Sequence, residues 1–180
     1  MDLKKITLVS FGYFEEGLLK IIASAVEKEF SVPAYITEGR LDLSEFYDPV
    51  RRQYNGTKLL KEIDTLYSSE STKVMGLLTV DLFIPILTYI FGQAYLNGNT
   101  GIASSYRFKN ERYGLQADDK VLLERLIKEI IHELGHTFGL IHCHVPQCVM
   151  LSGSYVEDID QKSRDFCPEC RQALDALFQK

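Results

Sequence analysis

Apolar and polar residues follow two different periods along the first third of the chain. Residues 5–12 are rich in β-branched and apolar side chains, which indicates a strand, and residues 14–30 carry apolar side chains at helical spacing. Residues 32–37 have the composition of a second strand, and residues 57–67 again show the spacing of an amphipathic helix. Residues 41–55, between them, are mixed and aromatic and indicate no single element. The pattern predicts the order strand, helix, strand, helix.

Strand-forming residues dominate the next part of the chain. Residues 74–80 form an apolar run that predicts a strand, and residues 81–85 are expected to be a connection. Residues 89–96 and 102–108 flank a stretch rich in Asn and Gly, which is typical of a β-hairpin. The run from Met75 to Gly92 is also apolar enough to suggest a membrane span. Its Asp would cost about 2.5–3.5 kcal/mol at mid-bilayer, so two core strands explain this run better.

The longest helical pattern covers residues 119–138. Asp118 is placed to cap its first turn, and Asp119 complements the helix dipole. An apolar stripe on one side is expected to face the core, and polar side chains including two histidines occupy the other side, so the histidines should face a cleft. The stripe consists of Leu123, Ile127, Ile131, Leu134 and Phe138, and the polar side of Arg125, Glu129, His132 and His136. Residues 171–178 are expected to contain a terminal helix that begins after Cys170.

Length, charge and the first residues indicate the number of domains, the kind of partner and the location of the protein. The 180 residues fit one domain, which can bury about 70% of the surface that the unfolded chain exposes. Lys and Arg number 20 against 25 Asp and Glu, an acidic balance that argues against a nucleic-acid partner. Residues 1–5 contain an acid and lead into a strand, unlike a signal peptide. We therefore expect a cytoplasmic, monomeric protein that is not bound to a membrane.

The end of the long helix carries the pattern H-E-x-x-H-x-x-G-x-x-H. Because His132 and His136 are four residues apart, both imidazoles can reach one zinc ion, and Gly139 can end the helix so that His142 reaches the same ion. Three histidines leave a fourth position for water, which is typical of catalytic zinc. Glu133 is then placed to act as general base. A lone H-E-x-x-H occurs by chance, but the added glycine and third histidine make coincidence improbable.

Four cysteines form a second candidate metal site in the pattern C-x4-C and C-x2-C, with members Cys143, Cys148, Cys167 and Cys170. Two closely spaced pairs suit tetrahedral thiolate coordination of a structural zinc, and two disulfides are the alternative. Since Cys143 directly follows His142, the two sites should share a wall. His144 remains outside both patterns; we interpret it as a surface histidine, with a substitute metal ligand as the alternative.

These motifs resemble those of the metzincin clan of zinc peptidases, and within it the archaemetzincins. The matching residues are His142-Cys143, Cys148-Val149-Met150 and Cys167-Pro168-Glu169-Cys170, which follow the histidine motif. The resemblance covers residues 132–170 closely and the rest only in the order of its elements. It implies that Met150 is the Met-turn methionine beneath the catalytic metal. Astacin-like relatives have a tyrosine ligand two residues later, where this chain has Ser152, and Tyr155 is out of register.

The resemblance also implies an α+β fold with an α/β-like N-terminal part. A mixed sheet with backing helices and an active-site helix would form an upper subdomain (residues 1–138). A small zinc-stapled subdomain with the four-cysteine site (residues 139–180) would follow. By the same resemblance, residues 89–96 would be an antiparallel edge strand above the cleft. A peptide could add to this strand, although an ordinary solvent-exposed or paired strand is the alternative.

The sequence therefore predicts a zinc metallopeptidase with two zinc ions per chain, one catalytic and one structural, that acts on a peptide or small protein. The peptide substrate follows from the resemblance, because zinc chemistry alone would serve other amides or esters. One alternative is a two-zinc module that binds peptides or proteins with little catalysis, although the presence of Glu133 argues against it. The other is a zinc hydrolase of a nonpeptide substrate.

Overall fold

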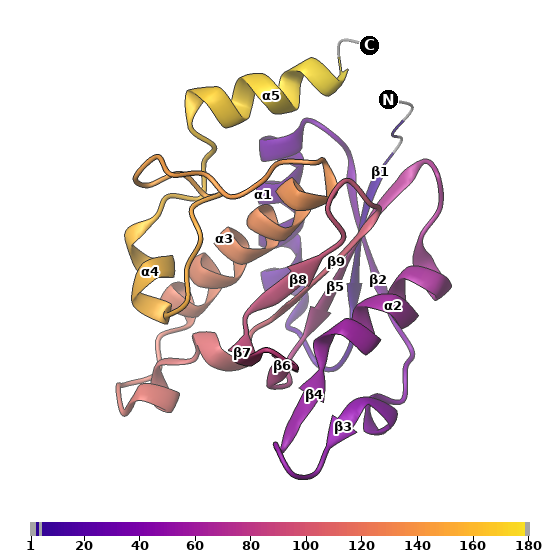
Figure 1. Ribbon diagram of the computed structural model, residues 1–180, viewed down its shortest axis with the longest axis vertical. Helices are drawn as coiled ribbons and strands as arrows, with labels where there is room; N and C mark the ends of the chain where they lie inside the picture. Colours follow the sequence, from indigo (N-terminus) through magenta and orange to yellow (C-terminus); the bar gives the residue numbers. More distant parts are fainter. Residues whose placement is uncertain (1–2, 4, 179–180) are drawn as a thin grey trace.

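A five-stranded mixed sheet forms the centre of the computed structural model, which describes residue 3 and residues 5–178 (Figure 1). The strand order is β2-β1-β5-β9-β8, and only the β8–β9 pair is antiparallel. The strands are β1 (Lys5–Ser10), β2 (Ala34–Glu38), β5 (Thr72–Leu78), β8 (Gly92–Ala94) and β9 (Thr100–Ser104). The strands predicted near residues 5–12, 32–37 and 74–80 are confirmed. Strand β8 lies at an edge of the sheet.

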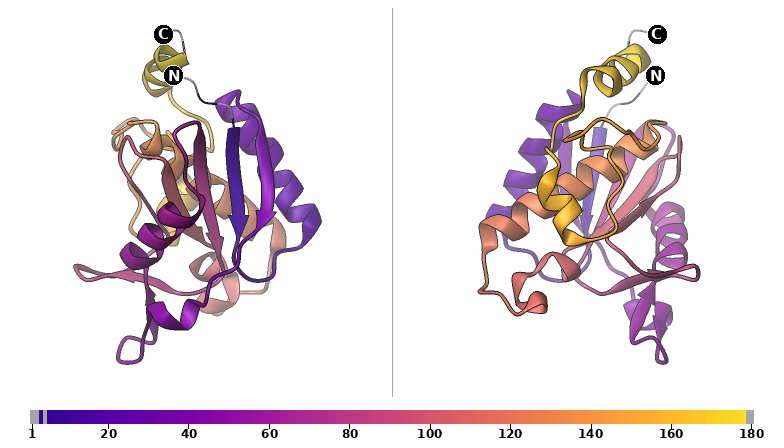
Figure 2. Two further views of the ribbon diagram at one scale, coloured as in Figure 1. Left: turned by 90° about the vertical axis from the view of Figure 1, so that its right-hand side faces the viewer. Right: turned by 60° about the vertical axis from the view of Figure 1, so that its left-hand side comes forward.

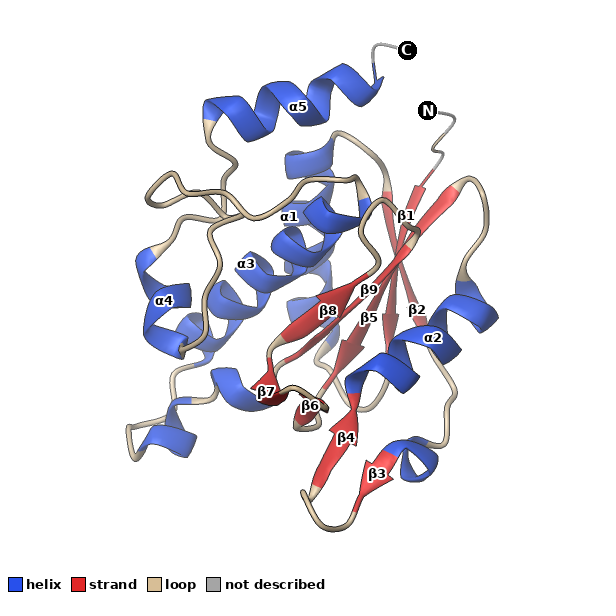
Figure 3. Ribbon diagram, in the orientation of Figure 1, coloured by secondary structure: helices blue, strands red, loops and turns tan. Residues whose placement is uncertain are grey.

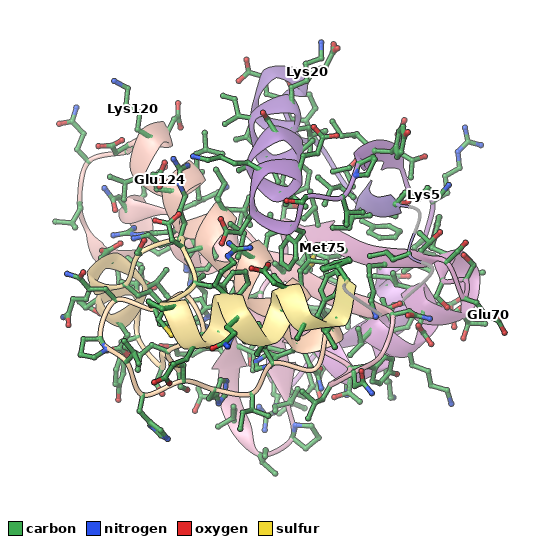
Figure 4. All side chains as sticks on the ribbon, turned by 90° about the horizontal axis from the view of Figure 1, so that it is seen from above. Lys5, Lys20, Glu70, Met75, Lys120 and Glu124 are labelled. Atoms are coloured by element: carbon green, nitrogen blue, oxygen red, sulfur yellow. The ribbon has the colours of Figure 1, made fainter. Side chains whose placement is uncertain are left out.

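Helices cover both faces of this sheet (Figure 2). On one face, α1 (Glu16–Phe30) and α3 (Asp119–Thr137) enclose the larger apolar core with β1, β5 and β9. On the other face, α2 (Gly56–Tyr67) packs Leu59, Leu60 and Ile63 against the sheet. The helices predicted at residues 14–30, 57–67 and 119–138 are confirmed. Charged side chains such as Lys20 and Lys120 project outward from the helices in Figure 4, whereas Met75 of the central sheet is fully buried.

A second, four-stranded sheet was not predicted (Figure 3). It has the order β3-β4-β6-β7, with β3 (Tyr47–Asp48), β4 (Gln53–Asn55), β6 (Leu82–Ile84) and β7 (Leu87–Ile90). The prediction of residues 81–85 as a connection was wrong, because β6 lies there. A turn between β6 and β7 folds the apolar run back on itself, so β7 pairs antiparallel with β6. The prediction of two core strands between Met75 and Gly92 therefore missed one strand.

The predicted hairpin is present but shorter than expected. Residues 89 and 90 belong to β7, so only β8 pairs with β9 as the hairpin. The second arm ends at Ser104, whose hydroxyl donates to Val80 O (2.6 Å) and accepts from the backbone N–H of Tyr106 (3.2 Å). These bonds turn the chain into a 3-10 helix at Tyr106–Phe108. Two further 3-10 helices occupy Leu43–Phe46 and Asn110–Tyr113.

The C-terminal part contains two short helices, α4 (Val156–Gln161) and α5 (Pro168–Phe178). The terminal helix was expected after Cys170, but it begins at Pro168, because proline suits the first helical position. Cys170 therefore lies in its first turn. The α+β class, with helices on a mixed sheet and a C-terminal cysteine cluster, is confirmed.

Five residues lie outside the part of the chain that the structure describes. They are residues 1, 2 and 4, on which the prediction of no signal peptide partly depends, and residues 179 and 180 at the end of the predicted domain. Among the residues that are described, no helix combines the length and apolarity that crossing a membrane requires.

Candidate functional site

Helix α3 supports two of the three histidines. The carboxylate of Asp118 caps its first turn by accepting from the backbone N–H groups of Lys120 (3.0 Å) and Val121 (3.1 Å), as predicted. One helical turn separates His132 from His136, and their Nε2 atoms lie 3.1 Å apart. The sequence therefore places two imidazole nitrogens side by side at the end of a well-capped helix.

A glycine turn brings the third histidine to the same point. Gly139 has φ +90°, and its N–H donates to His136 O (2.9 Å) while that of Leu140 donates to Gly135 O (3.0 Å). This pair of bonds is the Schellman arrangement, which ends a helix and redirects the chain. The predicted role of Gly139 is confirmed. Ligand atoms of His142 and the two helical histidines all lie within 4.8 Å of one another.

The geometry of the histidines fits zinc. Two nitrogens bound tetrahedrally at about 2.0–2.1 Å from zinc lie about 3.4 Å apart, close to the observed separation. Nδ1 of His132 donates to Val149 O (2.8 Å), and Nδ1 of His136 donates to Leu140 O (2.7 Å). In both rings the hydrogen is then on Nδ1, and Nε2 presents its lone pair to the centre of the cluster. Burial lowers the pKa of all three imidazoles, which favours the neutral, ligating form.

Glu133 is 5% exposed and lies at the same cleft. Burial raises its pKa well above the usual range, and the neighbouring charge of Glu129 raises it further. The two carboxyl groups share a hydrogen bond and stand four residues apart on α3. Glu129 was assigned only to the polar side of the helix, although its spacing from Glu133 could have indicated the pair.

Sequence reasoning missed Lys162, which is 3% exposed beside the histidines. Its Nζ donates to Leu151 O (3.1 Å) and lies 3.4 Å from Nδ1 of His132. Burial lowers its pKa, and the charges of Glu129 and Glu133 act in the opposite direction. Lys162 directly follows α4 and belongs to no periodic pattern or motif, so no signal in the sequence indicated that it would reach the site.

A cleft of about 480 Å³ is lined by His132, His142 and Glu133. Residues 87–92 of β7 and β8 line one side, and residues 152–155 line the other. The hydroxyl of Tyr89 spans the cleft and donates to Ser154 O (2.9 Å). Gly92 brings the strand close to α3, because a Cβ at this position would lie 2.8 Å from Cγ of Glu133. The edge strand predicted at residues 89–96 is therefore present here in part, as β8.

Met150 is fully buried and packs against Gly135, where an added Cβ would lie 2.5 Å from its Sδ. The absence of a side chain at Gly135 is what allows this close contact. The position of Met150 beneath a metal stays a prediction. Ser152 and Tyr155 line the cleft, whereas His144 is exposed and belongs to neither group of candidate metal ligands.

The four cysteines form the second cluster, with sulfur atoms within 4.8 Å of one another and no disulfide. Sγ of Cys143 lies 3.8 Å from Sγ of Cys167, whereas a disulfide bond measures about 2.05 Å. Thiolates on a tetrahedral zinc at about 2.3 Å lie about 3.8 Å apart, so this geometry fits a metal. Backbone N–H groups of Val145 and Cys167 donate to cysteine sulfurs (3.3 and 3.4 Å), as expected for thiolates.

The two clusters are connected through the segment between them. Cys143 follows His142 directly, and its backbone N–H donates to Met150 O (2.9 Å). The segment 143–150 therefore begins in the cysteine cluster, at Cys143, and ends at Met150, which packs against α3, the helix that carries two residues of the histidine cluster. The expectation that the two sites share a wall is confirmed.

Comparison with known proteins gives consistent results. The model of the family "Peptidase family M54" matches residues 19–176. The chain is 33% identical to an archaemetzincin of Thermococcus kodakarensis over 178 residues, with 96% of each chain covered. It is 38% identical to one of Methanopyrus kandleri over 179 residues, covering 94% of this chain and 95% of the relative.

Two solved structures have the same fold. The crystal structure of the Methanopyrus kandleri archaemetzincin has a TM-score of 0.86 at 32% identity, covering 99% of this chain and 97% of that one. A zinc-dependent peptidase from Methanocorpusculum labreanum has a TM-score of 0.84 at 30% identity, covering 94% of this chain and 99% of that one.

Proposed function

The chain belongs to the archaemetzincin family of metallopeptidases, peptidase family M54, and on this premise we propose that it hydrolyses peptide bonds with Glu133 as the general base. The observation that carries the proposal is the position of this buried carboxyl group. It lies at the cleft beside three imidazoles whose ligand atoms are within 4.8 Å of one another.

In this proposal His132, His136 and His142 hold the catalytic zinc. Zinc supplies a Lewis acid that polarises the peptide carbonyl and makes water a nucleophile near neutral pH. The carbonyl oxygens of Val149 and Leu140 keep two of the imidazoles oriented toward the ligand position. In its ionised form, which the nearby charge of Lys162 favours, Glu133 would accept a proton from the attacking water and deliver it to the nitrogen of the leaving amine. Its buried position keeps bulk water from competing for that proton.

The proposal includes a second zinc ion. Cys143, Cys148, Cys167 and Cys170 would hold it and staple the lower subdomain, residues 139–180. The thiolate donor set and the closed tetrahedral spacing support a structural ion, since four protein ligands leave no open position. Met150, packed on Gly135 between the two helical ligands, would support the catalytic metal from beneath.

The substrate would be a peptide or small protein bound in extended form. Strand β8 is at the edge of the sheet, pairs with β9 alone among the strands that the structure describes, and lies beside the cleft. Its free N–H and C=O groups can pair with a peptide backbone, as in β-strand addition. Because Gly92 lies against Glu133, a peptide on this edge would carry its carbonyl toward the general base.

A mass-spectrometric screen of a peptide library with the parent protein and a Glu133→Gln variant tests the proposal. The variant should retain zinc and peptide affinity while turnover falls by about 10²–10⁴-fold, the usual share of general acid–base catalysis. His136→Ala is the control and should lose the catalytic zinc together with activity. The proposal fails if the parent cleaves no peptide, yet binds peptides as tightly as the Glu133→Gln variant does. That outcome would favour a peptide-binding module.

A further inference from the structure

A second cavity, of about 630 Å³, lies next to the cleft, and His142 lines both. One wall is the segment that leaves the end of α3, residues 139–146, and the other is the beginning of α5. Figures 1 and 2 show α5 crossing beside this segment. The cavity is large enough for one or two amino-acid side chains.

The walls of this cavity are mostly apolar and open to solvent. Ile141 is 69% exposed and Val145 is 36% exposed, although both lie within three residues of a proposed metal ligand. Leu140, Pro146 and Ala173 complete the apolar lining. Exposed apolar side chains gathered around a concave site beside a reaction centre indicate a surface that a ligand covers.

The charge at the rim of the cavity is negative. Glu169, in the first turn of α5, is exposed there, and Cys143 and Cys170 also line it. Four thiolates holding one zinc ion would leave a net charge of about −2 at this wall. None of the described lining residues is Lys or Arg. The cavity therefore favours an apolar group that has a basic group next to it.

The edge strand leads toward this cavity. After β8 the chain reaches Asn97, whose N–H donates to His136 O (2.8 Å) and whose Oδ1 lies 3.4 Å from the Cβ position of Gly139. Gly139 is the first residue of the cavity wall. A peptide that pairs antiparallel with β8, the more stable pairing, has its amino-terminal residues at this end. These residues leave the cleft next to the second cavity.

We propose that the second cavity is a substrate subsite for residues on the amino-terminal side of the scissile bond, and that it takes an apolar side chain with an adjacent Lys or Arg. This inference rests on the proposed peptidase function. It assigns the four-cysteine module a part in substrate selection, because α5 and Cys143 form a wall of the subsite.

A ladder of acetylated peptides tests the inference. The peptides share one cleaved sequence and are lengthened one residue at a time on the amino-terminal side. Their affinity for the zinc-loaded Glu133→Gln chain is measured by fluorescence anisotropy, and cleavage by the parent is followed in parallel. Affinity should rise about tenfold or more at the length at which a leucine reaches the cavity. A lysine next to that leucine in the peptide should raise the affinity further, and this additional increase should shrink at high salt.

Variants on α5 show whether the cavity causes this gain. Ala173→Trp fills the cavity and should abolish the gain from leucine, whereas Ala176→Trp, about one turn further along the same helix, should keep it. Glu169→Lys should remove the gain from lysine, and Asp175→Lys should keep it. Val145→Asn provides a second test from the opposite wall. Melting curves establish that each variant is folded.

The outcomes separate the two proposals. If the parent cleaves peptides but affinity does not rise at any peptide length, the subsite is contradicted and the peptidase function is not. The same holds if the rise in affinity from leucine persists in Ala173→Trp. A gain that appears only when the peptide is extended on its carboxyl-terminal side contradicts it as well. A parent chain that cleaves no peptide contradicts the hydrolytic function and, with it, the assignment of the cavity to one side of a scissile bond.

Discussion

At the scale of single residues, Gly135 of α3 stands where the packing leaves no room for a side chain. An added Cβ would lie 2.5 Å from Sδ and 3.2 Å from Cε of Met150. Alanine normally favours a helix by about 1 kcal/mol over glycine, whereas overpacking a core costs about 1–3 kcal/mol. We predict that Gly135→Ala lowers the free energy of unfolding by up to about 2 kcal/mol, the overpacking cost less the helix preference, as measured by urea denaturation. Displacement of Met150 should also weaken zinc binding.

Gly17 in α1 is the matched control. A Cβ there has only the side chain of Glu15 nearby, at 3.8 Å, and φ is not positive. Gly17→Ala should therefore leave the free energy of unfolding unchanged or raise it by up to about 1 kcal/mol. Equal effects of the two substitutions would contradict the packing role given to Gly135.

At the scale of elements, Lys73 of β5 holds the end of α3. Its side chain is buried, and Nζ donates to Thr137 O (2.9 Å), Gly98 O (2.5 Å) and Asn99 Oδ1 (3.2 Å). A cation at a helix C-terminus also interacts favourably with the dipole. Lys73→Met would leave buried acceptors unpaired, at about 1–3 kcal/mol. We predict a lower melting temperature and, because the helix end carries His136, weaker catalytic zinc binding.

Lys120→Met is the control for this effect, because Lys120 is exposed at the start of the same helix and its side chain makes no hydrogen bond among the described residues. Its melting temperature and zinc affinity should match those of the parent. If Lys73→Met also matches the parent, Lys73 does not support the helix end.

Elements with their own periodicity were predictable, and those defined by long-range pairing were not. Helix α3 has an apolar stripe, a capping Asp118 and a terminating Gly139, so its limits and its histidine pair could be read locally. Strand β6 has only three residues and pairs with β4, about 28 residues earlier, which no local pattern encodes. Lys162 reaches the site for a similar reason. Its place depends on how α4 packs against α3, not on its neighbours in sequence.

At the scale of the whole molecule, the histidine cluster and the cysteine cluster, both candidate metal sites, are joined through residues 142–150. We predict about two zinc ions per chain by elemental analysis, one easily exchanged and one tenacious, because three histidines and four cysteines are different kinds of site. A single zinc, with cysteines found by mass to be disulfide-linked, would disprove the second ion.

The same connection predicts an asymmetry between the sites. Cys170→Ser should lower the free energy of unfolding by several kcal/mol, because binding of a structural zinc contributes directly to folding. It should also weaken the catalytic site, since Cys143 is covalently attached to His142. Glu133→Gln should leave thermal stability nearly unchanged. Melting curves of the two variants, recorded with and without a chelator, check this; a Cys170→Ser variant as stable as the parent would contradict it.

The turn at Gly139 limits how the segment between the second and third histidines can evolve. Leu140 uses its N–H to end α3 at Gly135 and its carbonyl to orient the ring of His136. Inserting or deleting one residue would therefore disrupt the end of α3, change the orientation of the His136 ring and move His142 away from the other two histidines. Side chains that face solvent here, such as Ile141, could be replaced without disturbing these bonds, whereas any change in the length of the segment would disturb all of them together.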